Sequence, residues 1–168
     1  MGFINTISRE QLMLPVSIDE YVSSDNFVRF AVKHNLPLVI HKRQSYQPIM
    51  EILNEFKGEK LKGIFHCFSG SLSQAEEMIE KGFLLGIGST ITYKASILYT
   101  ILPYIPLEYI VLETDAPFLT PNPYRGQRNK SSFLPIIAQR IAGIKQITTQ
   151  EVAEQTTKNA VELFGFQR

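Results

Sequence analysis

Residues 109–117 read YIVLETDAP, a largely apolar run followed by two carboxylates and a proline. Consecutive apolar residues without polar alternation are typical of a buried strand in a parallel sheet. Pro117 cannot continue the strand, because it has no N–H to donate to a neighbouring strand. Asp115 therefore follows the carboxyl end of the strand, at the edge where parallel α/β sheets and barrels bind their ligands.

Two earlier apolar stretches also end in a side chain that can bind a metal. Leu38–Ile40 runs into His41, and Gly63–Phe65 runs into His66. The carboxyl ends of parallel strands meet at one edge of the sheet, so these side chains are expected to converge there with Asp115. The three strand ends together predict a hydrolase-like site.

The rest of the chain alternates between helical and strand patterns. Apolar spacing, capping residues and glycine or proline stops predict helices over residues 25–34, 46–56, 73–81, 95–102, 133–144 and 149–164. A break in the last helix is expected near Thr156, and strands are expected over 38–41, 63–68, 83–87 and 109–113. Residues 1–24 are expected to be irregular, with at most one short helix. This alternation predicts an α/β fold with a parallel sheet, in one domain over residues 25–168.

Composition sets limits on the class of protein. The chain has 168 residues, enough for one domain with a core, and its formal net charge of +1 means that an anion must be bound by a local cluster. The single cysteine, Cys67, excludes an internal disulfide and is typical of a reducing compartment. The sequence contains neither an apolar run of about 18 residues nor a signal-peptide pattern, so we expect a cytoplasmic protein without a membrane span.

His41, His66 and Asp115 form the candidate metal site. Imidazole and carboxylate donors suit Zn²⁺, Mn²⁺ or a similar divalent ion, which lowers the pKa of a bound water and lets it attack a phosphoryl or carbonyl centre. The alternative is that the histidines pack in the core and Asp115 only terminates its strand. Glu113 shares the face of Asp115 and is expected to hydrogen-bond a ligand or a metal-bound water. Cys67 is expected to point to the opposite face and to pack.

A basic segment follows the Asp115 strand. Arg125 and Arg128 flank Gly126, and Arg43 lies just after His41. Guanidinium groups match phosphate geometry in bidentate fashion, and a glycine permits close backbone approach. These three arginines are therefore predicted to hold a phosphate, although such basic runs are more often solvated surface.

These motifs resemble those of the TatD family of metal-dependent deoxyribonucleases, in the amidohydrolase superfamily. The resemblance covers roughly residues 25–165, and its blocks are NLPLVIH at 35–41, GIFHCFSGS at 63–71, ETDAPFL at 113–119, PYRGQRN at 123–129 and the segment 152–165. It implies the C-terminal part of a TIM-type barrel, with His41, His66 and Asp115 as ligands of a two-metal site. It also implies hydrolysis of phosphodiester bonds in DNA, often from a 3′ end.

The chain also departs from the family pattern. The family's His-x-His pair and its Gly-Glu-Ile-Gly-like turn have no counterpart here, so about four of the eight barrel strands are expected. We therefore expect a phosphodiester hydrolase that uses Zn²⁺, Mn²⁺ or Mg²⁺, with Asp115 and Glu113 as catalytic residues and single-stranded DNA or 3′ ends as substrate. The alternative is a non-catalytic remnant or fragment of such an enzyme. Open strand edges at 38–41 and 109–113 predict a homodimer or a partner that covers them.

Overall fold

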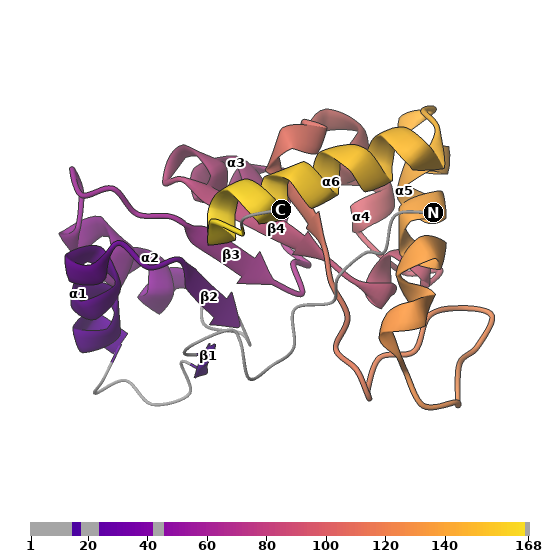
Figure 1. Cartoon of the computed structure of the whole chain (residues 1–168), viewed down its shortest axis with the longest axis horizontal. Coiled ribbons are helices and arrows are strands. Elements are labelled where there is room, and N and C mark those ends of the chain that lie inside the picture. Colours follow the sequence, from indigo (N-terminus) through magenta and orange to yellow (C-terminus); the bar gives the residue numbers. More distant parts are fainter. Residues whose placement is uncertain (1–14, 18–23, 42–45, 167–168) are drawn as a thin grey trace.

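The computed structural model describes residues 15–17, 24–41 and 46–166, and it contains a five-stranded parallel sheet (Figure 1). The strands follow one another in the order of the sequence, and they are β1 (Pro15–Ser17), β2 (Leu38–His41), β3 (Gly63–His66), β4 (Phe83–Ile87) and β5 (Ile110–Leu112). Each crossover therefore returns the chain to the next strand along the sheet. The predicted α/β fold with a parallel sheet is confirmed.

Strand β1 corrects the expectation that residues 1–24 are irregular. It pairs with β2 in parallel, with Pro15 opposite Val39 and Ser17 opposite His41. A three-residue strand is too short to give a periodic signal, and proline is tolerated at the first residue of an edge strand. The remaining residues up to 23 lie outside the described part of the chain. Consequently β2 is an interior strand of the sheet, and the prediction that it forms an open edge is wrong.

Six α-helices are described, and most agree with the predicted ranges. They are α1 (Ser24–His34), α2 (Tyr46–Glu55), α3 (Leu72–Glu80), α4 (Leu98–Ile101), α5 (Leu134–Lys145) and α6 (Thr149–Phe164). Short 3₁₀ turns lie at Ser89–Thr92 (η1), Leu102–Tyr104 (η2), Leu107–Tyr109 (η3) and Ser131–Phe133 (η4). None of the described helices is both long and apolar enough to cross a bilayer.

Two helix predictions need correction. The helix expected over 95–102 is reduced to the single turn α4, followed by η2, in which Pro103 has no N–H for a continuing α-helical bond. Helix α6 is continuous where a break was expected, and the Thr156 hydroxyl donates to the Val152 carbonyl oxygen at 2.8 Å inside the helix. A hydroxyl bonded in this way is compatible with an unbroken helix.

Two helices begin at capping boxes that are legible in the sequence. The Ser71 side chain accepts from the Gln74 N–H while Gln74 reaches back to the Ser71 N–H, and Thr148 and Glu151 form the same reciprocal pair. These contacts satisfy backbone donors that have no partner within the helix. The beginnings of α3 and α6 are therefore set by local sequence.

The core lies between the sheet and the helices; in Figure 1, α3 and α6 lie above the strands, α1 and α2 to their left and α5 to their right. Alternate strand residues face the helices, namely Leu38, Ile40, Phe65, Phe83, Leu85, Ile87 and Ile110. Because side chains alternate along a strand, His41 and His66 face the other side of the sheet. The register that pairs His41 with His66 places both at the carboxyl edge.

Candidate metal centre

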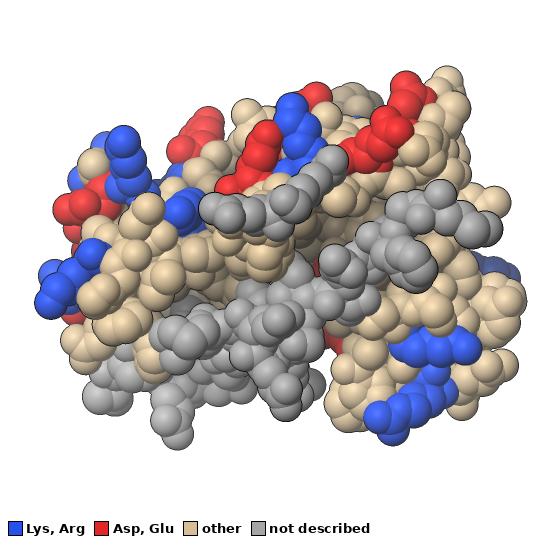
Figure 2. Space-filling view, in the orientation of Figure 1, with Lys and Arg blue, Asp and Glu red and all other residues tan. Residues whose placement is uncertain are grey.

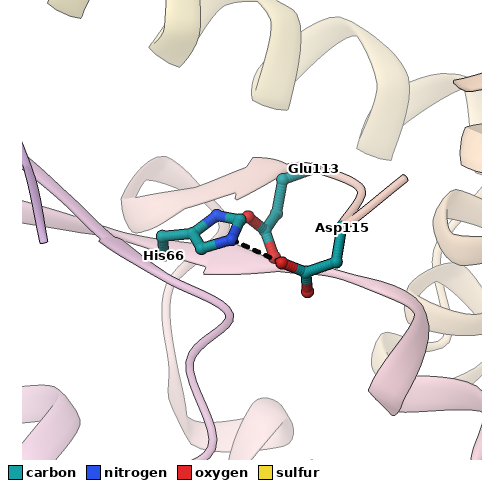
Figure 3. A group of neighbouring side chains, drawn as sticks. All are labelled: His66, Glu113 and Asp115. Carbon is teal, nitrogen blue, oxygen red and sulfur yellow. Dashed lines mark hydrogen bonds and ion pairs between the residues drawn. The ribbon is translucent and has the colours of Figure 1, made fainter. Parts of the chain in front are cut away.

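His66, Glu113 and Asp115 come together at the carboxyl ends of β3 and β5 (Figure 3). One donor atom of each lies within 4.8 Å of the others. Strand β4 separates β3 from β5, and its end carries Gly88, where an added Cβ would lie only 2.7 Å from Glu113 Oε1. The absence of a side chain at Gly88 therefore leaves room for the Glu113 carboxylate to reach His66.

The imidazole of His66 contacts both carboxylates. Its Nε2 lies 2.7 Å from Asp115 Oδ1, and its Nδ1 contacts Glu113 Oε2. Figure 3 shows both carboxylate side chains reaching toward the ring. All three side chains retain some exposure, with 23% for His66, 13% for Glu113 and 19% for Asp115. A ligand can therefore reach the centre from solvent.

The two oxygens of Glu113 have different partners. Oε1 accepts a hydrogen bond from the backbone N–H of Cys67 at 3.1 Å, while Oε2 contacts His66 Nδ1. A carboxylate that holds one ring nitrogen of a histidine orients the other nitrogen toward a metal. Glu113 therefore contacts the Nδ1 side of the ring and Asp115 contacts the Nε2 side.

The electrostatics keep Asp115 ionised. Burial raises the pKa of its carboxyl group, but the hydrogen bond and charge of His66 lower it, and the Cys67 thiol and the His41 charge lower it further. The net pKa lies below the ordinary value for aspartate. Asp115 is consequently an anionic oxygen donor at neutral pH, as a metal ligand must be.

Cys67 lies on the same side as the acidic group, and the prediction that it packs on the opposite face is wrong. Its backbone is left-handed, with φ 51°, so strand β3 stops at His66 and the alternation of side chains stops with it. Burial, followed by the charge of Asp115 and a hydrogen bond with it, raises the pKa of the thiol to about 12. Cys67 is therefore a neutral neighbour of Asp115.

His41 stands beside the centre without joining the donor group. Its ring centroid lies 5.4 Å from that of His66, with the rings tilted by 38°. Within the described residues, the group whose donor atoms meet consists of His66, Glu113 and Asp115. The structure thus brings together two of the three predicted ligands, His66 and Asp115, and adds Glu113 to them. The third predicted ligand, His41, lies next to the His66 ring but outside this group.

The basic loop lies between β5 and α5. The Arg125 guanidinium carbon is 4.3 Å from the Tyr93 ring centroid, and both Arg125 and Arg128 are exposed. Basic side chains are visible over this loop in Figure 2. No hydrogen bond or ion pair links either arginine to the centre within the described residues. Arg43, the third predicted phosphate ligand, lies outside the described residues.

Sequence reasoning missed Gly88 and the backbone N–H of Cys67, which together position Glu113. The Gly88-Ser89 dipeptide at the end of a predicted strand was a signal for close approach of another group. Nothing in the local pattern identified the Cys67 N–H as a donor to a residue 46 positions away.

The donor set fits a divalent metal ion. An imidazole nitrogen and a carboxylate oxygen 2.7 Å apart, both partly exposed, are the donors that Zn²⁺ and Mn²⁺ accept in proteins. Coordination would replace the hydrogen bond between His66 Nε2 and Asp115 and leave the Glu113 contact on Nδ1 in place.

The family model described as "TatD related DNase" matches residues 23–165. A Bacillus subtilis relative, described as the uncharacterized metal-dependent hydrolase YabD, is 40% identical over 140 residues, covering 83% of this chain and 55% of that protein. A Citrobacter rodentium relative, named 3'-5' ssDNA/RNA exonuclease TatD, is 31% identical over 144 residues, covering 82% of this chain and 55% of that protein.

A solved structure shares the fold. The crystal structure of YjjV, a TatD homologue from Escherichia coli, matches with a TM-score of 0.78 and 29% identity, covering 85% of this chain and 55% of that one. The chain thus spans about half the length of the relatives and of the structure that it matches.

Proposed function

This chain belongs to the family of TatD-related DNases, and from that premise we propose that it is a metal-dependent hydrolase of phosphodiester bonds in DNA. The observation that carries the proposal is the contact of His66 Nε2 with Asp115 Oδ1 at 2.7 Å, together with the contact of Glu113 with the other ring nitrogen, Nδ1. We favour an enzyme over a non-catalytic remnant, because one relative described above is named a metal-dependent hydrolase and the other an exonuclease.

The proposed roles follow from the contacts of each side chain. His66 Nε2 and Asp115 would hold the metal, with His41 as a further donor, and Glu113 would accept the Nδ1 proton of His66 and keep the ring oriented. A divalent ion held there supplies an activated water and stabilises charge on the phosphate. Arg125 and Arg128, with Arg43, would bind substrate phosphates.

The proposed substrate is the 3′ end of a single-stranded DNA. Support comes from the name of the Citrobacter rodentium relative, which is 31% identical to this chain. The identity of the metal is proposed only to the level of Zn²⁺, Mn²⁺ or Mg²⁺, because imidazole with carboxylate suits the first two and Mg²⁺ prefers oxygen donors. A cytoplasmic location is also proposed, supported by the single cysteine.

Titration calorimetry with Zn²⁺ and Mn²⁺ tests the proposed centre. We expect weak binding of one ion by the full chain, because the described donor group offers few ligands, and loss of that binding in Asp115→Asn. The matched control is Asp25→Asn, since Asp25 is a partly exposed aspartate on α1 that pairs with Arg29 at 2.9 Å. Equal binding by the parent chain and Asp115→Asn would contradict the proposed site.

Hydrolysis is measured in parallel. The parent chain should cleave a 3′-labelled single strand only in the presence of a divalent ion, and a chelator should stop the reaction. Cleavage that continues in the chelator would contradict the metal-dependent reaction.

A further inference from the structure

Phe118 is the most exposed large apolar residue in the described part of the chain, with 73% of its surface accessible. It follows Asp115 by three residues, on the loop that also carries Arg125 and Arg128. Burial of a phenylalanine side chain is favourable relative to its exposure, so the packing of the described residues does not account for the position of this ring.

The backbone that presents Phe118 is anchored on both sides. Its N–H donates to the Asp115 carbonyl oxygen at 2.7 Å, and its carbonyl oxygen accepts from Asn129 Nδ2 at 2.6 Å. Asn129 is only 2% exposed, and its own N–H donates to the Pro117 carbonyl oxygen at 3.0 Å. The ring thus projects from a segment tied to the metal-centre strand and to a buried side chain.

The loop combines a free aromatic ring with fixed positive charge. The Arg125 guanidinium lies over the Tyr93 ring at 4.3 Å, and Tyr93 donates its hydroxyl to the Thr120 carbonyl oxygen at 3.1 Å, next to the Phe118 segment. Figure 2 shows basic side chains on this region of the surface. Cations track the backbone of a nucleic-acid strand, and aromatic faces stack on its bases.

We propose that Phe118 stacks on an unpaired nucleobase of the substrate strand. The inference rests on the proposed function and specifies the substrate as a strand whose terminal bases are unpaired. In a duplex both faces of an interior base are stacked on neighbouring pairs, so Phe118 can bind a base only in a single strand or at a frayed end. A phosphodiester without a base would use the arginines alone.

The absence of tryptophan from the chain provides a direct probe. Phe118→Trp places a sole tryptophan at the proposed contact, and its emission should be quenched in a saturable manner by oligothymidylate of about 12 nucleotides, a length within the usual site sizes. A chelator is present to prevent cleavage. The matched control is Tyr104→Trp, because Tyr104 is 72% exposed in η2, ahead of β5 and away from its carboxyl end. Its emission should stay unchanged.

Binding constants complete the test. Phe118→Ala should weaken oligothymidylate binding by roughly 5- to 100-fold and Phe118→Tyr should restore it, while an abasic strand of equal length should bind the parent chain and Phe118→Ala equally. The inference is overturned if the parent chain does not bind oligothymidylate, if Phe118→Ala binds it as the parent does, or if Phe118→Ala changes the oligomeric state instead of the affinity.

Hydrolysis of bis(p-nitrophenyl) phosphate separates this inference from the proposed function, because that phosphodiester has no nucleobase. The parent chain should hydrolyse it when Zn²⁺ or Mn²⁺ is added, and Asp115→Asn should not. If the parent chain does not hydrolyse it, the proposed function fails while the binding data still decide the stacking. If the parent hydrolyses it and the binding data show no role for Phe118, only the inference fails.

Discussion

The His66 ring contacts a carboxylate at each nitrogen, and the two carboxylates differ in their other contacts. Asp115 faces Nε2, while Glu113 is held at one oxygen by the Cys67 N–H and contacts Nδ1 with the other. The orientation of Nε2 therefore depends on Glu113, which reaches the ring only because Gly88 leaves space beside it.

Glu113→Gln tests this dependence. The amide retains an acceptor for the Cys67 N–H but removes the negative charge from Nδ1, and loss of such an orienting partner typically costs about 10- to 100-fold in metal affinity. We expect a decrease of that size for Zn²⁺ by calorimetry. Glu162→Gln is the control, since Glu162 is exposed on α6 with only a 3.9 Å pair to Lys158. Unchanged affinity in Glu113→Gln would show that Glu113 does not orient His66.

Cys67 gives a prediction about pH. Burial and the charge of Asp115 raise the pKa of its thiol to about 12, whereas an unfolded thiol titrates near about 8.5. The folded state therefore favours the neutral thiol, so this contribution to stability is present below the unfolded pKa and is lost as pH rises toward the folded value.

Alkylation of Cys67 measures that shift, because it is the only cysteine. In the metal-free protein, the rate with iodoacetamide should keep rising above about pH 9.5, while the rate for the urea-unfolded chain should level off there. Matching pH profiles for the two states would contradict the raised pKa.

At the scale of elements, α6 packs against β5 and hydrogen-bonds to its backbone on the side away from β4. Asn159, which is 5% exposed, donates from Nδ2 to the Ile110 carbonyl oxygen at 2.8 Å and to that of Leu107 at 2.9 Å. The Glu113 N–H donates to the Ile87 carbonyl oxygen of β4, so the backbone groups of Glu113 face β4. Because backbone groups of successive residues point to opposite sides of a strand, the Ile110 carbonyl, three residues earlier, points away from β4. Helix α6 therefore covers part of the edge of β5.

Asn159→Ala should leave these carbonyl groups without their partner. A lost partner of this kind costs about 1–3 kcal/mol, and we expect that decrease in the free energy of unfolding by urea titration. Lys158→Ala, at an exposed position next to it, should change the free energy by less than about 0.5 kcal/mol. A loss confined to the control, or equal in both variants, would contradict the role of Asn159.

At the scale of the whole molecule, the described sheet has two outer strands. Strand β1 pairs only with β2 and β5 only with β4 among the described strands. The predicted edge at β5 is thus present, and the other edge is β1. Outer strands present unpaired backbone groups that can pair with another chain. Asn159 covers the Ile110 position of β5 but not the Leu112 position, which faces the same side.

We therefore predict that the chain self-associates or binds a partner along these strands. Sedimentation velocity over micromolar concentrations should show a dimer that dissociates on dilution, because pairing of edges adds backbone hydrogen bonds without a large buried core. A single monomeric species at every concentration, with native circular dichroism, would contradict this prediction.

Much of the fold is determined by short stretches of sequence and could be predicted from them. The bounds of β2, β4 and α6 follow from apolar runs, capping residues and glycine or proline stops, since these signals act over a few residues. The prediction that His66 and Asp115 approach each other also held, because parallel strands must bring their carboxyl ends to one edge.

The remaining features depend on contacts between residues far apart in the chain. Strand β1 exists through its pairing with β2, and Cys67 turns its thiol toward Asp115 because a left-handed residue interrupts the alternation of β3. Glu113 becomes the partner of His66 through the space at Gly88 and the N–H of Cys67. No periodicity encodes such contacts, since their energies depend on tertiary distances, and only the folded chain could reveal them.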